Sequence, residues 1–272
     1  MNAIGAARSF RKHLRIFGCY YRLNLASALE YRASFAIQAF GMALSNSSFI
    51  FFWWIAFRQV GGSIAGYSFE DVLFIWAASS GGFGLSTILF ANASNLSNLI
   101  ITGELDAFLL QPCSVLMNLI CAKTSLYAYG DAMYGIILMA LFYAGDSAAW
   151  LWFGYGVLLF AAIYAAITLT AHTLTFYMGD AGSIGALASQ FSLNFSIYPE
   201  SIYGPAVRAL MYSLIPAAIA VHVPLKLFRE LLHPAAALSA LGGAIAYCAA
   251  ACAFFYRGLR RYESGNVIVT KM

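Results

Sequence analysis

Long apolar segments without charged side chains dominate this sequence and restrict what it can fold into. Residues 33–57 and 72–91 contain no charged side chain, and residues 235–256 contain none before Arg257. A helix needs about 20 apolar residues to cross a bilayer core about 30 Å thick. Only 10% of the 272 residues are charged, whereas soluble domains carry roughly 25%. These features predict an all-α integral membrane protein with a single transmembrane domain over residues 1–272.

The distribution of basic residues predicts the number and the orientation of the spans. Ten of the fifteen Lys and Arg residues lie before the first apolar segment or after the last one. Cytoplasmic flanks of membrane proteins are enriched in these residues, so we expect both termini in the cytoplasm and an even number of crossings. We predict six transmembrane helices, at residues 33–57, 72–91, 124–145, 150–178, 181–199 and 235–256.

Residues 200–234 do not form a seventh straight span. Pro199 and Pro205 precede the apolar part of this segment, and Pro216 and Pro224 interrupt it. Proline lacks a backbone N–H and clashes with the preceding helical turn. Broken backbone at membrane depth is tolerated where it is buried in protein. We therefore predict a re-entrant pair of short helices that enters the membrane from one side.

An amphipathic segment, residues 4–32, precedes the first predicted span. Basic residues alternate there with apolar ones, as is typical of a helix that lies on anionic headgroups with its apolar side in the acyl region. The alternative is an ordinary basic cytoplasmic tail. The side chains expected to form the interface helix are Phe10, Arg11, Leu14, Arg15 and Phe17.

The cytoplasmic loop between the second and third spans contains a short amphipathic segment, residues 103–111. Gly103 breaks the preceding helix, and Pro112 is expected to end the new one. A helix of this kind can dock into a groove on a soluble partner, and the alternative is a connector that lies on the lipid. The acids favour the first turn of the helix, and the apolar residues share one face. The candidate docking residues are Glu104, Leu105, Asp106, Phe108, Leu109 and Leu110.

Two ionisable residues, Asp131 and His172, fall inside predicted spans. Charged groups at membrane depth are costly and often functional. We expect each of them to lie close enough to the cytoplasmic side to reach water. The five cysteines show no metal-ligand spacing, so no metal site is predicted.

Five motifs follow one another in a recognisable order. They are Glu-Tyr-Arg at 30–32, Thr-Gly-Glu-Leu-Asp-Ala-Phe-Leu-Leu-Gln-Pro at 102–112, Phe-Ser-Ile-Tyr-Pro-Glu-Ser-Ile-Tyr at 195–203, Ile-Pro-Ala-Ala-Ile-Ala at 215–220 with Pro224, and Arg-Gly-Leu-Arg-Arg-Tyr-Glu-Ser at 257–264. From about residue 15 to 266, the chain resembles the permease subunits of ABC-2 type exporters, in the branch whose paired permeases use a separate ATPase. Gln111 stands where a basic residue is common in this branch.

This resemblance implies partners and a location. In such permeases the N-terminal amphipathic helix meets the ATPase, the helix after the second crossing is the coupling helix, and a re-entrant pair precedes the last crossing. The implied partners are two copies of an ABC ATPase and a second permease half, either a copy of this chain or a related permease. The implied location is the bacterial inner membrane, with lipid as the surrounding partner and no nucleic acid.

The sequence contains no Gly-x-x-x-x-Gly-Lys-Ser/Thr phosphate loop, because none of its four lysines follows a glycine. We therefore expect ATP and Mg to be used by the partner subunit, with no cofactor and no catalytic residue in this chain. A membrane-embedded enzyme is one alternative, and it requires clustered His, Asp or Glu residues. A channel or passive carrier is another, and it needs no docking helix. The sequence does not identify a substrate.

Overall fold

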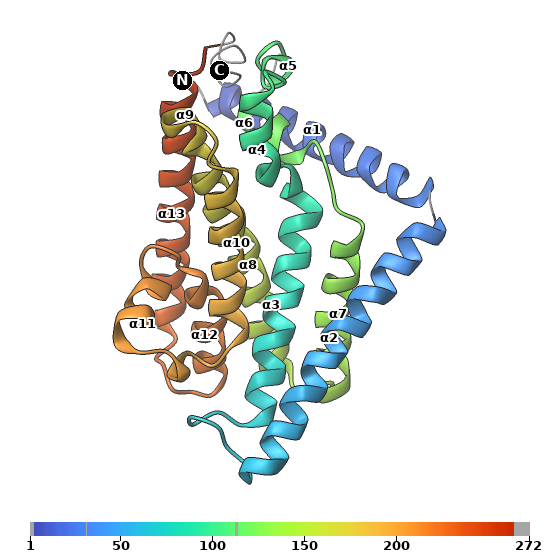
Figure 1. Cartoon of the computed structure of the whole chain (residues 1–272), viewed down its shortest axis with the longest axis vertical. Coiled ribbons are helices and arrows are strands. Elements are labelled where there is room, and N and C mark those ends of the chain that lie inside the picture. Colours follow the sequence, from blue (N-terminus) through green and yellow to red (C-terminus); the bar gives the residue numbers. More distant parts are fainter. Residues whose placement is uncertain (1–2, 31, 112–113, 264–272) are drawn as a thin grey trace.

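The computed structural model describes residues 3–30, 32–111 and 114–263, where all regular elements are helical (Figure 1). This confirms the predicted all-α membrane protein. The long helices are α1 (Ala3–Glu30), α2 (Arg32–Val60), α3 (Phe69–Phe90), α7 (Tyr127–Phe142), α8 (Ser147–Thr173), α10 (Gly182–Ile197) and α13 (Ala235–Leu259). The short ones are η1 (Ala91–Asn95), α4 (Leu96–Ile101), α5 (Asp106–Leu109), α6 (Val115–Cys121), α9 (Thr175–Met178), η2 (Glu200–Ile202), α11 (Pro205–Tyr212) and α12 (Ala217–Phe228).

Helix α3 forms the centre of the bundle, and every residue from Asp71 to Gly82 is buried. Small residues let neighbouring helices approach it closely, as is common between membrane helices. A Cβ placed on Gly82 would lie 2.5 Å from Cβ of Phe160 in α8. A Cβ on Gly135 of α7 would lie 2.6 Å from the carbonyl oxygen of Ala77. Larger residues at these two glycines would therefore force the helices apart.

Four helical segments are long and apolar enough to cross a membrane: α2, α3 continued to Ile101, α8 continued to Met178, and α13. The bent pair α11–α12 is either a broken fifth span or a re-entrant loop. Helices α7 and α10 have 16 residues each, so each spans only about 24 Å at 1.5 Å per residue. The structure is thus a multi-pass membrane protein, and the count of six spans stays a prediction.

Helices α11 and α12 meet at an angle of 96°. Pro205 is the first residue of α11, and Pro216 directly precedes α12. Pro224 was expected to interrupt the segment, but it lies inside α12. The facing helix α8 accommodates it, because a Cβ on Gly156 would lie 3.1 Å from the Ala220 carbonyl oxygen and 3.3 Å from Cγ of Pro224. This carbonyl is the one that a proline at 224 leaves without its helical donor.

The bundle has two different ends (Figure 1). Helices α1, α5 and α6 and the last turn of α13 gather at one end, which we call the terminal end. Helices α11 and α12 and the loop of residues 61–68 lie at the other, which we call the opposite end. Helix α1 runs across the terminal end at an angle to the bundle axis. The described chain thus begins and finishes at the same end of the bundle.

Candidate coupling element and polar cavity

The predicted coupling segment folds as a compact loop at the terminal end, and we call residues 102–111 the coupling loop. Its helix α5 is a single turn, Asp106–Leu109, and is therefore shorter than the predicted 103–111. Gly103 has a φ of 76°, in the left-handed region that glycine adopts without strain. The chain turns there, so that the Leu105 N–H donates to the Leu99 carbonyl at 3.1 Å. Pro112, expected to end the helix, lies outside the described residues.

Leu105 holds the coupling loop on the bundle. The sequence predicts this side chain on the partner-facing side, but the structure places it inside the chain, with 0% of its surface exposed. The turn at Gly103 causes the difference, because it directs position 105 back toward α4 rather than outward. The other buried members of this cluster are Leu96, Leu99, Ile100, Leu116, Leu119, Ala166, Leu169, Ala251 and Phe255.

The tip of the coupling loop presents apolar side chains outward. Leu110 is 87% exposed and Leu109 is 41% exposed. Glu104 is also exposed, beside this apolar tip. Phe108 is half-buried and contacts the cluster around Leu105. Of the predicted docking residues, the two leucines at the end of α5 are therefore the ones most available to another molecule.

Helix α1 contacts the coupling loop and its neighbours. The Tyr20 hydroxyl donates to Oε1 of Gln111 at 3.3 Å, and Nδ2 of Asn24 donates to the Cys121 carbonyl at 3.1 Å. Phe17 lies against Phe90 at the end of α3, with ring centroids 6.4 Å apart. Arg15 is exposed. The side chains of the other predicted interface residues, Phe10, Arg11 and Leu14, lie outside the described part of the chain.

Asp106 connects the coupling loop electrostatically to the end of the chain. Burial, together with the nearby negative charge of Asp106, raises the pKa of the Tyr262 hydroxyl to about 12. Tyr262 follows α13 and also contacts the Leu105 cluster. The coupling loop is thus bounded by α1 on one side and by the residues after α13 on the other.

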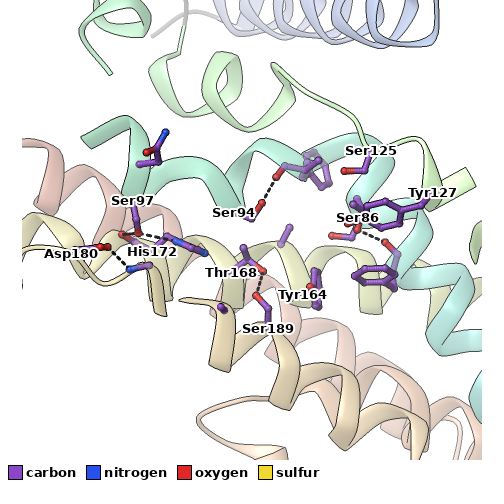
Figure 2. Close-up of a pocket in the computed structure, with 18 of the residues that line it drawn as sticks. Ser86, Ser94, Ser97, Ser125, Tyr127, Tyr164, Thr168, His172, Asp180 and Ser189 are labelled. Carbon is purple, nitrogen blue, oxygen red and sulfur yellow. Dashed lines mark hydrogen bonds between the residues drawn. The ribbon is translucent and has the colours of Figure 1, made fainter. Parts of the chain in front are cut away.

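A polar cavity of about 420 Å³ lies below the coupling loop, between α3, α4, α7, α8 and α10 (Figure 2). Hydroxyl groups face it from several helices, and some of them bond to each other. The Thr168 and Ser189 hydroxyls are 3.2 Å apart and join α8 to α10. Tyr127 and Tyr164 contribute aromatic surface. Such a lining can exchange hydrogen bonds with a polar solute or with water.

His172 is buried and lines this cavity, and its access to water from the cytoplasmic side stays a prediction. Its Nδ1 lies 2.8 Å from the Ser97 hydroxyl, and the Thr175 hydroxyl donates to the same Ser97 oxygen at 2.8 Å. Asp180 accepts the Gly182 N–H at 2.8 Å. Ser97 thus joins α4 to α8 and α9, and the Ala181 N–H before α10 donates to the Thr175 hydroxyl at 3.3 Å. This favours a structural role over a nucleophile with its general base.

Helix α4 lines the cavity and leads directly into the coupling loop. Ser97, Asn98 and Ile101 line the cavity, and Leu99 accepts the hydrogen bond that closes the turn at Gly103. A displacement of the coupling loop would therefore be transmitted to one wall of the cavity through a single six-residue helix.

The opposite end is held by ion pairs within the chain. Asp71 forms a reciprocal capping box with Ser68 at the start of α3 and pairs with Nη1 of Arg229 at 3.1 Å. Nζ of Lys226 lies 2.5 Å from Oε1 of Glu200. The second carboxylate oxygen of Glu200 accepts the hydroxyl of Tyr212. Lys226 of α12 and Arg229 at its C-cap thus each pair with an acid of a neighbouring element.

Asp131 is the other ionisable residue of the predicted spans. It is buried in α7, where Nδ2 of Asn46 in α2 donates to its Oδ1 at 2.8 Å, and its access to water from the cytoplasmic side stays a prediction. Pro199, the remaining predicted re-entrant proline, directly precedes η2.

Within the described residues, no group of three or more His, Cys, Asp or Glu side chains is placed to hold a metal ion.

Sequence reasoning missed the polar cavity and the partner of Asp131. One signal was present, because Thr168 and His172 lie four residues apart in an uncharged span and so share one helix face. Polar residues on one face of a membrane helix indicate a face turned toward protein or a cavity. The pairing of Asp131 with Asn46 left no such signal, since the two residues are 85 positions apart.

The helical bundle, its broken helix pair and its internal polar cavity define a multi-pass membrane protein of the transport class. The family model for ABC-2 family transporter proteins matches residues 44–265. The chain therefore belongs to the ABC-2 transporter family, and it is a membrane permease of an ABC transporter. No curated protein and no solved structure matches the chain.

Proposed function

We propose that this chain is the export permease half of an ABC transporter and that a separate ATPase subunit drives it through the coupling loop. The carrying observation is the pair of exposed leucines, Leu109 and Leu110, on a loop whose base is fixed by the buried Leu105. An apolar tip on a rigid base is suited to insertion into a groove of a partner. Two ATPase copies would serve two permease halves, and ATP and Mg would bind to the ATPase.

The connection through α4 supports this mechanism. When an ATPase dimer closes, it can move a permease only through a firmly held contact that transmits the force. The coupling loop is hydrogen-bonded to Leu99 and continues into the α4 wall of the polar cavity. A push on Leu110 would therefore reach the cavity through α4.

The expected setting is the bacterial inner membrane, with the terminal end in the cytoplasm. The basic residues around both ends of the chain support this orientation. Tags placed before Met1 and after Met272 should then both be accessible only from the cytoplasm. Access to the two tags from opposite sides of the membrane would contradict an even number of spans.

The direct experiment compares two leucine-to-serine changes at exposed positions. Leu110→Ser alters the tip of the coupling loop, and Leu231→Ser alters the opposite end, where Leu231 is 62% exposed. Loss of an anchor in a well-packed interface costs about 2 kcal/mol or more, which lowers affinity by more than tenfold. We expect Leu110→Ser to weaken co-purification of the ATPase subunit and to abolish its permease-stimulated hydrolysis, whereas Leu231→Ser leaves both unchanged.

Equal ATPase binding by the two variants would contradict the proposed coupling. Export is tested in the same reconstituted vesicles, because ATP supplied on the ATPase side should drive solute away from that side. Solute movement without ATP would support the passive carrier instead.

A further inference from the structure

Asp131 is a buried acid of the membrane domain, and one of its two carboxylate oxygens lacks a hydrogen-bond partner in the described chain. Its side chain is 3% exposed, and its only hydrogen bond in the described chain is the one from Asn46 to Oδ1. Oδ2 has no hydrogen-bond partner there. No Lys, Arg or His of the described residues forms an ion pair with Asp131. A buried carboxylate without a counter-charge is costly, and a cationic ligand would remove that cost.

The acid lines a cavity of about 170 Å³ between α2, α3, α7 and α10. One water occupies about 30 Å³ in the liquid, so the space holds about five waters or one small organic molecule. Most of its lining is apolar, and a few polar side chains interrupt it. The polar residues beside Asp131 are Asn46, Trp76, Ser79, Ser80, Gln190 and Asn194.

Trp76 is the second residue of this cavity with an unsatisfied group. Its indole N–H is buried and has no acceptor in the described part of the chain. Phe49 stacks on the ring at a centroid distance of 4.0 Å, which leaves the edge of the indole to make polar contacts. Asp131 thus has one unsatisfied acceptor and Trp76 one unsatisfied donor, both buried in the wall of the cavity, so a ligand reaches them only when these side chains turn toward it.

The cavity adjoins the larger polar cavity along the same two helices. Phe83 of α3 lines both of them. On α10, residues Gly182, Ala186 and Ser189 face the larger cavity, and Gln190 and Asn194 face the smaller one. A molecule in the larger cavity is therefore separated from Asp131 by the aromatic ring of Phe83.

We infer that the Asp131 cavity binds a small molecule, or the end of a longer one, that carries an ammonium group and a hydrogen-bond acceptor a few bonds away. The ammonium donates to Oδ2 of Asp131 and neutralises its charge, and the acceptor takes the indole N–H of Trp76. Serine and amide oxygens around them can accept the remaining ammonium protons. That such a molecule is a transported substrate rests on the proposed function. That the molecule binds in this cavity does not.

Binding is measured on the purified chain in phosphatidylcholine nanodiscs, without any ATPase. The probe is 5-amino-1-pentanol, and the comparison compound is 1,5-pentanediol, which has the same number of heavy atoms and no charge. A hydrogen bond to a charged group contributes enough to change affinity at least tenfold. We expect the amino alcohol to bind at least tenfold more tightly than the diol. Equal binding of the two compounds, or no binding of either, would overturn the inference and leave a cavity that holds only water.

Two variants assign the contacts. Asp131→Asn keeps the shape of the side chain and should lower affinity for the amino alcohol at least tenfold, whereas the exposed control Glu230→Gln should not change it. Trp76→Phe should weaken the amino alcohol about fivefold, the value of one neutral hydrogen bond. The same change should leave pentylammonium, which has no acceptor, unaffected. Equal losses for both probes would show that Trp76 acts only by filling space.

The outcomes separate this inference from the proposed function. Tight binding that depends on Asp131, in a protein whose ATPase neither co-purifies nor responds, would keep the site and reject the coupling. Normal ATPase coupling with no preference for the ammonium probe would keep the permease and reject the site.

Discussion

The two ends of this bundle are built in contrasting ways. At the opposite end, the residues around α12 are joined to α3 and η2 by two ion pairs, Asp71 with Arg229 and Glu200 with Lys226. Aromatic rings reinforce the joint, since Phe74 and Phe228 stack with centroids 5.5 Å apart. At the terminal end, the coupling loop is fixed from beneath by Leu105 and leaves Leu110 outside.

The contrast shows that exposure of apolar residues has different meanings in different places. Leucines on the sides of the bundle are covered by lipid, so their exposure needs no other partner. Leu110 lies on the same loop as the exposed Glu104, at the end where α1 and the last turn of α13 gather. Apolar surface at such a polar rim is typical of a protein contact. At the opposite end, by comparison, four charged residues form ion pairs within the chain: Asp71 with Arg229, and Glu200 with Lys226.

The largest loss of stability should come from the base of the coupling loop. Leu105→Ala removes a fully buried side chain from a packed cluster, and such changes cost about 3 kcal/mol. Denaturant titration in micelles should therefore show a clear drop in the free energy of unfolding. A change below about 1 kcal/mol would mean that the loop is not anchored by this residue.

A smaller loss is expected from the capping acid at the opposite end. Asp71→Ala removes the acid of the α3 capping box that accepts the Ser68 N–H, and it leaves Arg229, whose side chain is 35% exposed, without its partner. We expect a cost of about 2 kcal/mol. The matched control is Asp146→Ala, which removes the cap of α8 but no ion pair and should cost about 1 kcal/mol. Equal costs would show that the Arg229 pair contributes nothing.

Lys226→Met should have a still smaller effect. Lys226 is partly exposed, and the buried Glu200 keeps its hydrogen bond from Tyr212 when Lys226 is lost, so we expect a cost of about 1 kcal/mol. Methionine keeps the apolar stem of the side chain, so thermal unfolding should shift only slightly. The same variant should bind the ATPase normally, which distinguishes the opposite end from the coupling loop.

Much of this fold could be predicted because the membrane imposes simple rules on sequence. The runs around α2, α3 and α13 are uncharged and long, and Pro216 marks the bend before α12. The direction of Leu105 could not be predicted, because the turn at Gly103 changes which side of the loop faces the bundle. The position of Pro224 inside α12 depends on Gly156 of another helix, a contact that local sequence does not reveal.

The smallest effect on stability and the most direct test of function concern the same residue. Leu110 touches little of its own chain, so a photo-reactive amino acid at this position should leave folding unchanged. With the ATPase present, the account predicts an adduct between position 110 and the ATPase, and none from position 231 at the opposite end. Adducts with lipid alone at position 110, while the ATPase binds elsewhere, would contradict the coupling mechanism.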